Sequence, residues 1–258
     1  MKKIIYLILF LVNMNIIFGQ ELPKEAYLLY PTLQDMSGYA VGKWQNKLLI
    51  FGGRIKSDVP DIYKKDFPNL EIILIDLVQK RASAYNSGNL EGVLGEQMAS
   101  TGLAYYQKSN LLYIAGGYGY SDEVRSFITF PYFTVIDLEL TIPALVAGKS
   151  PVAHIYQICD ERIAIFNGTL DFNGDEFFLI NGKYAYKLQP FEDQPTYYEE
   201  DREGEGATFR LSQDGKALSI KAFKNWYDLQ ELLDYYSNNL PPNAQKEAEK
   251  TIKKKTSQ

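Results

Sequence analysis

The stretch that decides the fold is residues 38–53, which read GYAVGKWQNKLLIFGG. Two further segments align with it without gaps: residues 102–117 read GLAYYQKSNLLYIAGG, and residues 167–182 read NGTLDFNGDEFFLING. Each segment has a strand-like run, a polar turn and a second, apolar run that ends at glycine, the pattern of a β-hairpin. The closing glycines recur at intervals of 64 and 65 residues. Three copies at a near-constant interval indicate an internal repeat.

A third strand is expected after each of the first two hairpins. Residues 72–77 read IILIDL, and residues 133–138 read FTVIDL. A Phe-Pro pair precedes each run, at Phe67-Pro68 and Phe130-Pro131. We expect the two pairs to occupy equivalent positions in the first two repeats. Each run closes with Asp-Leu, and the two aspartates, Asp76 and Asp137, are 61 residues apart. Because aspartate favours turns, we expect it to begin the connection to a fourth strand.

The third copy is looser but has the same parts. Its third and fourth strands are predicted at Ala207–Leu211 and Ala217–Lys221, joined at Gln213-Asp214-Gly215, a glycine-containing hairpin signal. Tyrosine and phenylalanine are abundant, with 20 and 14 residues, and suit pleated, half-buried strands. The sequence therefore predicts an all-β domain of three clear four-stranded units.

These units resemble kelch repeats, and most of all the secreted bacterial kelch proteins described as galactose-oxidase-like. In a kelch blade the second of four strands ends in a diglycine, a place held here by Gly52-Gly53, Gly116-Gly117 and Asn181-Gly182. The resemblance covers about residues 36–222 and implies a kelch-like β-propeller. The interval exceeds the roughly 50 residues usual for kelch, and the expected fourth-strand tryptophan is absent, with Tyr85 in its place. The likeness is carried by Ile50–Arg54, Tyr113–Tyr120, Thr129–Pro131 and Asp160–Arg162.

Three blades are fewer than the about four to eight with which propellers close. One solution is a strand at Tyr27–Tyr30 that completes a last blade and closes a small, irregular propeller. The other is an incomplete propeller, in a shortened relative of a longer family. The second is favoured, because the resemblance stops where another blade should begin.

The two ends of the chain differ from this repeat. Residues 1–19 are predicted to be a signal peptide, since Lys2-Lys3 precede an apolar run and Gly19 offers a small residue for cleavage. We therefore expect a secreted, periplasmic or cell-surface protein with no stable membrane span after cleavage. Residues 20–225 form the predicted propeller domain, and residues 226–258 a short amphipathic helix followed by a lysine-rich tail.

Composition excludes several classes of site. The net charge of −5 argues against a nucleic-acid partner, which would need a basic surface. His154 and Cys159 are the single histidine and the single cysteine, too few for the copper site that the galactose-oxidase resemblance would imply or for a Cys/His zinc site. A serine or cysteine catalytic apparatus would need His154 as its base. We expect no cofactor or metal, and we expect Cys159 to be buried.

Two acidic segments are interpreted as structural. Asp171–Glu176 has clustered oxygen ligands, but its glycine is fourth where a calcium loop of the EF-hand type needs it sixth, so a hairpin turn is predicted. The acidic residues between Glu192 and Glu205 are predicted to be a solvated loop.

The loops that follow the diglycines are the best candidates for function. Arg54 follows the first, while Tyr118 and Tyr120 follow the second, with Arg125 nearby. Corresponding loops of successive blades meet on one face of a propeller, and arginine and tyrosine suit recognition of sugars, carboxylates and proteins. We therefore predict an exported, non-catalytic module that binds a glycan or a protein. An alternative left open is that the tyrosines only pack between blades.

An enzymatic alternative rests on resemblance alone. Kelch-type sialic acid mutarotases would need an acid/base carboxylate and an arginine in the central mouth of the propeller. Glu123 with Arg125, and Asp160 with Arg162, are the candidates for that pair.

Overall fold

The structure is a computed structural model, and it describes residues 22–56, 67–184 and 202–224. The predicted signal peptide and the predicted C-terminal helix and tail lie outside the described residues. Most of the acidic loop, up to residue 201, also lies outside them. No helix in the described ranges is long and apolar enough to cross a membrane.

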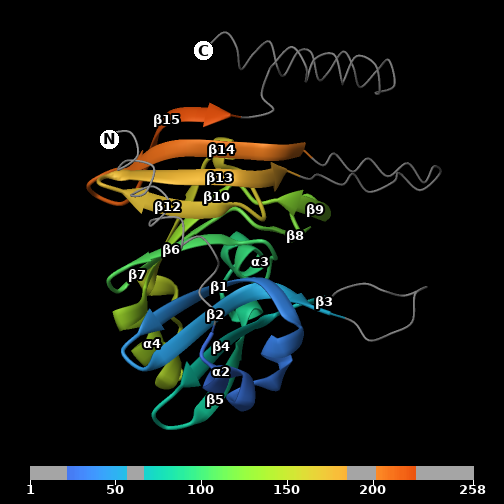
Figure 1. The fold of residues 1–258 in the computed structure, drawn as a ribbon, viewed down its shortest axis with the longest axis vertical. Coiled ribbons are helices and arrows are strands. Elements are labelled where there is room, and N and C mark those ends of the chain that lie inside the picture. The colour runs from blue at the N-terminus through green and yellow to red at the C-terminus, as the bar shows by residue number, and fades with distance from the viewer. Residues whose placement is uncertain (1–21, 57–66, 185–201, 225–258) are drawn as a thin grey trace, which may run out of the picture.

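The described chain is mostly β, and three antiparallel sheets follow one another along the sequence (Figure 1). In each, four strands are hydrogen-bonded in chain order. The first sheet contains β1 (Met36–Trp44), β2 (Lys47–Ile55), β4 (Glu71–Asp76) and β5 (Arg81–Asn86), and the short β3 (Phe67–Pro68) also pairs with β2. The second contains β6 (Ala104–Lys108), β7 (Leu111–Ala115), β10 (Tyr132–Asp137) and β11 (Ile155–Cys159). The third contains β12 (Thr169–Asn173), β13 (Glu176–Tyr184), β14 (Arg202–Leu211) and β15 (Leu218–Lys224).

The remaining elements lie before or between these strands. Helix α2 (Lys24–Leu29) and the 3-10 turn η2 (Pro31–Asp35) precede β1. The short η4 (Ser87–Asn89) and helix α3 (Val93–Met98) connect the first two sheets. A separate hairpin, β8 (Tyr118–Ser121) and β9 (Ser126–Thr129), lies between β7 and β10 in sequence. Helix α4 (Leu138–Val146) and η5 (Val152–His154) precede β11, and η6 (Glu161–Ile163) follows it.

The repeat is confirmed in the register of the strands. Gln45, Ser109 and Gly174 occupy the same place in the three hairpin turns and share a left-handed backbone, with φ of 53°, 56° and 70°. In β2 and β4, Leu48 pairs with Ile75, and in β7 and β10 the equivalent Leu112 pairs with Ile136. The three predicted four-stranded units are therefore present.

The diglycines allow close contact between each sheet and the segment that follows it. The Gly53 N–H donates to the Ser100 carbonyl at 2.8 Å, and the Gly117 N–H donates to the Ile165 carbonyl at 3.0 Å. A Cβ added at Gly116 would lie 1.6 Å from that Ile165 oxygen. Gly53 and Gly117 are thus equivalent positions, and only glycine fits such a backbone approach.

The third copy departs from this pattern. Gly182 pairs with Glu205 of β14 instead of contacting a following sheet, next to an irregularity in the strand register. Asn181 is left-handed, with φ of 56°, but Gly182 is not. The side chain of Ile165 occupies the space where a Cβ of Gly182 would lie, 1.7 Å away, so glycine is still required there.

The expected equivalence of the two Phe-Pro pairs is wrong. The last glycine of each diglycine accepts a backbone hydrogen bond from the segment before the third strand. The donor to Gly53 is the Asn69 N–H at 2.9 Å, and the donor to Gly117 is the Phe130 N–H at 2.8 Å. These positions are 61 residues apart, the same interval as the aspartates. Phe130 is fully buried, whereas Phe67 is 56% exposed. Phe67-Pro68 is instead the short strand that pairs with the end of β2.

Two apolar layers join the three sheets. Leu49, Phe51 and Leu74 of the first sheet pack against Leu112 and Ile136 of the second, with α3 and α4 completing the layer. Both faces of β2 and β4 are buried, which explains why these two strands are continuous apolar runs.

Aromatic rings dominate the layer between the second and third sheets. Phe133 lies 5.3 Å from Phe177 and 5.2 Å from Phe209 between ring centroids, edge to face in both pairs. This is the favoured geometry for aromatic contact. A different set of side chains therefore joins each pair of neighbouring sheets.

The predicted N-terminal strand at Tyr27–Tyr30 is wrong, because this segment belongs mainly to α2. Apolar residues at Leu22, Ala26, Leu29 and Leu33 follow helical spacing, and they pack on the outer face of the first sheet. That face is therefore covered by the chain's own N-terminal segment. Within the ranges described, no strand of the first sheet pairs with the third, and no closed ring of sheets is formed.

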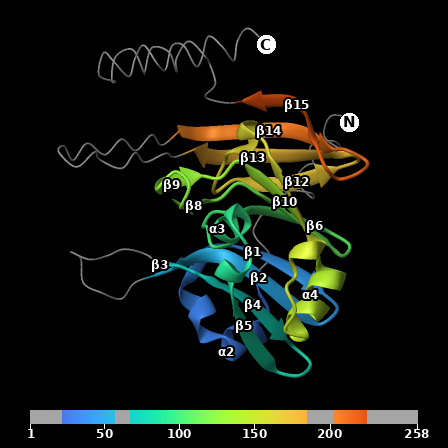
Figure 2. The same ribbon diagram turned by 180° about the vertical axis from the view of Figure 1, so that it is seen from behind.

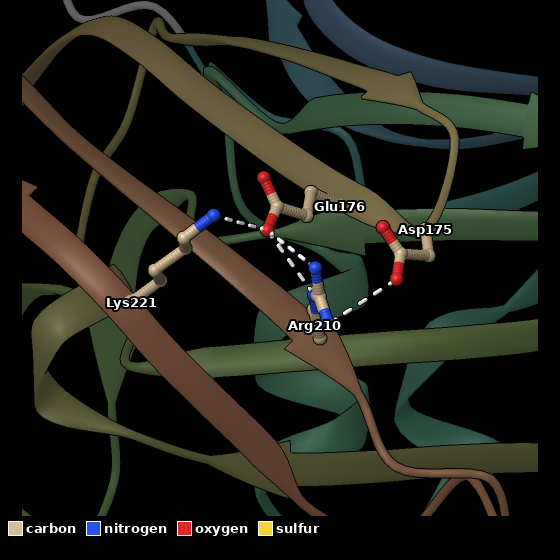
Figure 3. Close-up of polar contacts among 4 residues, drawn as sticks. All are labelled: Asp175, Glu176, Arg210 and Lys221. Carbon is tan, nitrogen blue, oxygen red and sulfur yellow. Dashed lines mark hydrogen bonds and ion pairs between the residues drawn. The ribbon is translucent and has the colours of Figure 1, made fainter.

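The outer face of the third sheet instead carries ion pairs (Figure 3). Glu176 accepts from Lys221 at 2.7 Å and from Arg210 at 2.9 Å, and Arg210 also approaches Asp175 at 3.2 Å. The two cations hold the pKa of Glu176 below its usual value, with Lys221 contributing most. The ion pairs share this face with Phe178 and the 40% exposed Ile180, which alternate with Glu176 along β13.

The first sheet has an ion pair at the same place with its charges inverted. Lys47 lies opposite Asp76 in the register and contacts it at 2.8 Å, as Glu176 lies beside Arg210. The N–H groups of Val78 and Gln79 also donate to Asp76, so this residue starts the turn to β5 as expected. The Gln79 N–H and then Lys47 lower the pKa of Asp76. At the equivalent Asp137, the turn is replaced by α4, which Asp137 caps.

Candidate functional site

A cleft of about 730 Å³ lies between the first sheet, α3 and the β8–β9 hairpin. Both views of the ribbon show α3 between these two parts of the molecule (Figure 1 and Figure 2). The first sheet and its connections contribute Arg54, Pro68, Leu70 and residues 86–88. Helix α3 contributes Gly95 and Glu96, and the hairpin contributes Tyr118, Tyr120, Asp122 and Phe127. The cleft therefore combines aromatic, apolar, amide and charged groups.

Three of the four predicted binding residues line this cleft. Arg54 and Tyr118 each follow a diglycine and are equivalent positions of the first and second repeats, so the repeat itself brings them to one face. Tyr120 is two residues further along β8 and projects to the same side of the hairpin as Tyr118. Arg125 does not line the cleft. It is exposed in the turn between β8 and β9, with a left-handed φ of 55°.

The hairpin turns its aromatic face outward. Tyr118, Tyr120 and Phe127 share one face, where the Tyr118 and Phe127 rings lie 6.0 Å apart and the Tyr120 and Phe127 rings 5.6 Å apart. Tyr120 and Phe127 are 41% and 44% exposed. The opposite face carries Ser121 and Ser126, each only 3% exposed. Large aromatic groups outside and small serines inside reverse the usual arrangement, so the hairpin presents an exposed aromatic surface beside the cleft.

Gln97 anchors α3 to the second sheet. Its buried amide nitrogen donates to the carbonyls of Gly116 and Tyr132, both at 2.9 Å. Its oxygen accepts from the Thr134 hydroxyl at 2.6 Å and from the Gln157 amide at 2.9 Å. Because these bonds satisfy both ends of a fully buried amide, they fix the orientation of the helix and place the preceding residue at the cleft.

That preceding residue, Glu96, has too few hydrogen-bond donors. Its Oε1 accepts from the Asp122 N–H at 3.2 Å, while its Oε2 is buried and has no partner among the described residues. A carboxylate has room for about four donors. No sequence pattern predicts this residue, because α3 is only six residues long and too short for a helical periodicity.

Side-chain hydrogen bonds also fix the wall formed by the first sheet. The Asn69 amide donates to the carbonyls of Gly52 and Glu71, at 2.9 and 2.8 Å. The Ser87 hydroxyl donates to the Leu70 carbonyl at 2.9 Å, and Asn86 accepts from the Gly88 N–H at 2.7 Å. These bonds tie residues 69–71 and 86–88 to each other and to the first sheet at the mouth of the cleft.

The two pairs considered for mutarotase chemistry lie elsewhere. Glu123 is exposed in the same turn as Arg125, and neither lines the cleft. Arg162 donates to Asp160 through Nε at 2.8 Å and Nη2 at 2.7 Å. The first cause of the lowered pKa of Asp160 is this hydrogen bond to Arg162. The two side chains thus hydrogen-bond to each other, and Asp160 caps the start of η6.

The remaining candidate residues are structural or exposed. The hairpin turn predicted at Asp171–Glu176 is confirmed, since residues on both sides pair as β12 and β13. Cys159 was expected to be buried, but it is exposed, because it ends β11 at the outer edge of the second sheet. In the described part of the chain, no group of three or more His, Cys, Asp or Glu side chains could hold a metal ion.

Comparison with known proteins assigns no family. No protein-family model matches the chain, and no curated protein matches its sequence.

Proposed function

We propose that this chain is an exported binding module, built from kelch-type propeller sheets, whose cleft binds a glycan. The observation that carries the proposal is the meeting of Arg54, Tyr118 and Tyr120 in one cleft beside an outward-facing aromatic hairpin. A sugar ring has an apolar C–H face and an edge of hydroxyl groups. The aromatic face of the hairpin suits the first, and the charged and amide groups of the opposite wall suit the second.

The repeated register supports the propeller scaffold. Backbone hydrogen bonds join the first residue of each repeat to that of the next. The Gly102 N–H donates to the Gly38 carbonyl at 2.8 Å, and the Asn167 N–H donates to the Gly102 carbonyl at 2.7 Å. First strands gathered in this way are what radially arranged blades require. With α2 covering one end and ion pairs on the other, we infer that the described residues form an arc of three blades.

The test of glycan binding is a glycan-array screen of the purified protein, followed by titration of the strongest hit. The Tyr120→Ala variant is expected to weaken binding roughly fivefold, since an aromatic contact contributes about 1 kcal/mol. The matched control is Tyr156→Ala, an equally large change at a tyrosine that is 56% exposed on β11 and outside the cleft. Equal binding by both variants would refute the proposal.

A protein partner is the second candidate, and one observation favours it. The apolar surface extends beyond the cleft, because Phe67 and Val124, which do not line it, are 56% and 45% exposed. Aromatic and arginine side chains beside apolar groups are typical of protein-binding hot spots. A pull-down in which Phe67→Ser loses a partner while glycan binding is unchanged would favour this candidate.

Export can be tested separately. Fusion of residues 1–19 to a reporter enzyme that is active only outside the cytoplasm should give activity, and replacement of Lys2 and Lys3 by glutamate should reduce it. A reporter that stays inactive would contradict export.

A further inference from the structure

We propose that Glu96 is the specificity-determining residue of the cleft, and that it accepts a hydrogen bond from a hydroxyl or ammonium group of a neutral or amino sugar. This inference rests on the proposed glycan-binding function. It adds the chemical class of the ligand, because it excludes acidic sugars.

The first argument is the unmet hydrogen-bonding capacity of the Glu96 carboxylate. The Asp122 N–H donates to Oε1 at 3.2 Å, and the buried Oε2 has no donor in the described part of the chain. The side chain lines the cleft, and its carboxylate has capacity for further donors. A donor brought by a ligand would complete the hydrogen bonding of this group.

The second argument is that the carboxylate is held in place before binding. Gln97 ties α3 to the second sheet through four hydrogen bonds, and the carbonyl of Ser100 just beyond the helix accepts from Gly53 of the first sheet. Because the helix is anchored to both sheets, Glu96 keeps its place relative to the aromatic hairpin. A fixed acceptor beside a fixed aromatic surface selects for the position of a donor on the ring that stacks there.

The third argument is the sign of the charge. The charged side chains that line the cleft are Arg54, Glu96 and Asp122, so acidic groups outnumber basic ones. A carboxylate or sulfate on the ligand would be repelled by two of the three. Neutral and amino sugars avoid this repulsion, and an amino group gains from it.

The experiment compares array binding of three glycan classes: neutral, amino-bearing, and acidic glycans that carry sialic or uronic acid. We expect neutral or amino-bearing glycans to bind and acidic glycans not to bind. The Glu96→Gln variant keeps the shape and the acceptor for the Asp122 N–H, but it is expected to bind about tenfold more weakly, since a charge-assisted bond is lost. The control Glu91→Gln changes an exposed carboxylate outside the cleft and should bind as the unaltered protein does.

The loss of affinity in Glu96→Gln for different glycans shows whether the donor is an ammonium or a hydroxyl group. If the donor is an ammonium group, Glu96→Gln weakens amino-bearing glycans much more than their N-acetylated counterparts. If it is a hydroxyl group, both are weakened equally. Thermal melts of each variant establish that a loss of binding is not a loss of folding.

The outcomes also separate this inference from the proposed function. Preferential binding of acidic glycans, or normal binding by Glu96→Gln while Tyr120→Ala binds poorly, overturns the role of Glu96 and leaves glycan binding intact. Normal binding by both variants, or no glycan binding at all, overturns the proposed function and this inference together.

Discussion

Replacement of Gln97 by leucine tests whether one buried amide holds the cleft together. The side chain makes four hydrogen bonds and is fully buried, so leucine preserves most of the volume but removes all four bonds. At about 1 kcal/mol of net stability per bond, the expected loss in the free energy of unfolding is about 4 kcal/mol. That is a large share of the about 5–15 kcal/mol of a typical domain.

Urea unfolding followed by circular dichroism measures this loss. The control is Gln79→Leu, the same change at an exposed glutamine whose side chain lies on the surface of the first sheet. Because Gln97 positions α3, we also expect Gln97→Leu to weaken glycan binding under conditions where the protein remains folded. A loss below about 1 kcal/mol, with the control unchanged, would refute the view that these four bonds anchor the helix.

Three further predictions concern the repeat, acid stability and the enzymatic alternative. Gly116→Ala should lower the free energy of unfolding in urea by more than about 3 kcal/mol, because the new Cβ would lie 1.6 Å from a carbonyl oxygen. The control Gly148→Ala has the same φ of 67° but meets nothing within 4 Å, so it should lower that free energy by only about 1–2 kcal/mol. Amide and lysine donors lower the pKa of Asp76, so its contribution to stability is present above the unfolded value of about 3.9 and is lost as the pH falls through the lower, folded value. In a pH series of thermal melts, Asp76→Asn should therefore be less stable than the unaltered protein at neutral pH, and the gap should narrow in acid; a constant gap would contradict this. Arg125→Ala should leave glycan binding unchanged, unlike Arg54→Ala, and NMR should detect no acceleration of sialic acid anomer exchange; an acceleration that Arg125→Ala abolishes would favour the enzyme instead.

Strands and hairpins could be predicted from the sequence because their signals are local. Apolar runs and turn residues at a fixed interval locate β1 and β2, β6 and β7, and β12 and β13 without any long-range information. Tyr27–Tyr30 contains strand-favouring tyrosines and so predicts a strand, whereas this segment forms most of the six-residue helix α2. The tertiary contact with the first sheet overrides local preference there.

Only those residues of the candidate site that occupy equivalent positions in the repeats, or follow from strand alternation, could be predicted from the sequence. Arg54 and Tyr118 follow diglycines, so equivalence alone predicted that they lie on one face, and Tyr120 follows by strand alternation. Arg125 lies in the turn of the β8–β9 hairpin, and the described residues of the first sheet contain no equivalent hairpin, so the repeat does not predict its position. Glu96 lies on a short helix whose place is set by the buried contacts of Gln97, and those contacts join residues up to 60 positions apart.

The inverted ion pairs have a consequence for how three similar hairpins find their own partners. A chain with repeated segments risks pairing a strand with the wrong copy during folding. If the β4 strand joined the third hairpin, Asp76 would lie opposite Glu176, and if β14 joined the first hairpin, Arg210 would lie opposite Lys47. Both exchanges put like charges face to face, which destabilises cross-strand pairs. The opposite polarity of these two ion pairs thus disfavours pairing between strands of the first and third copies.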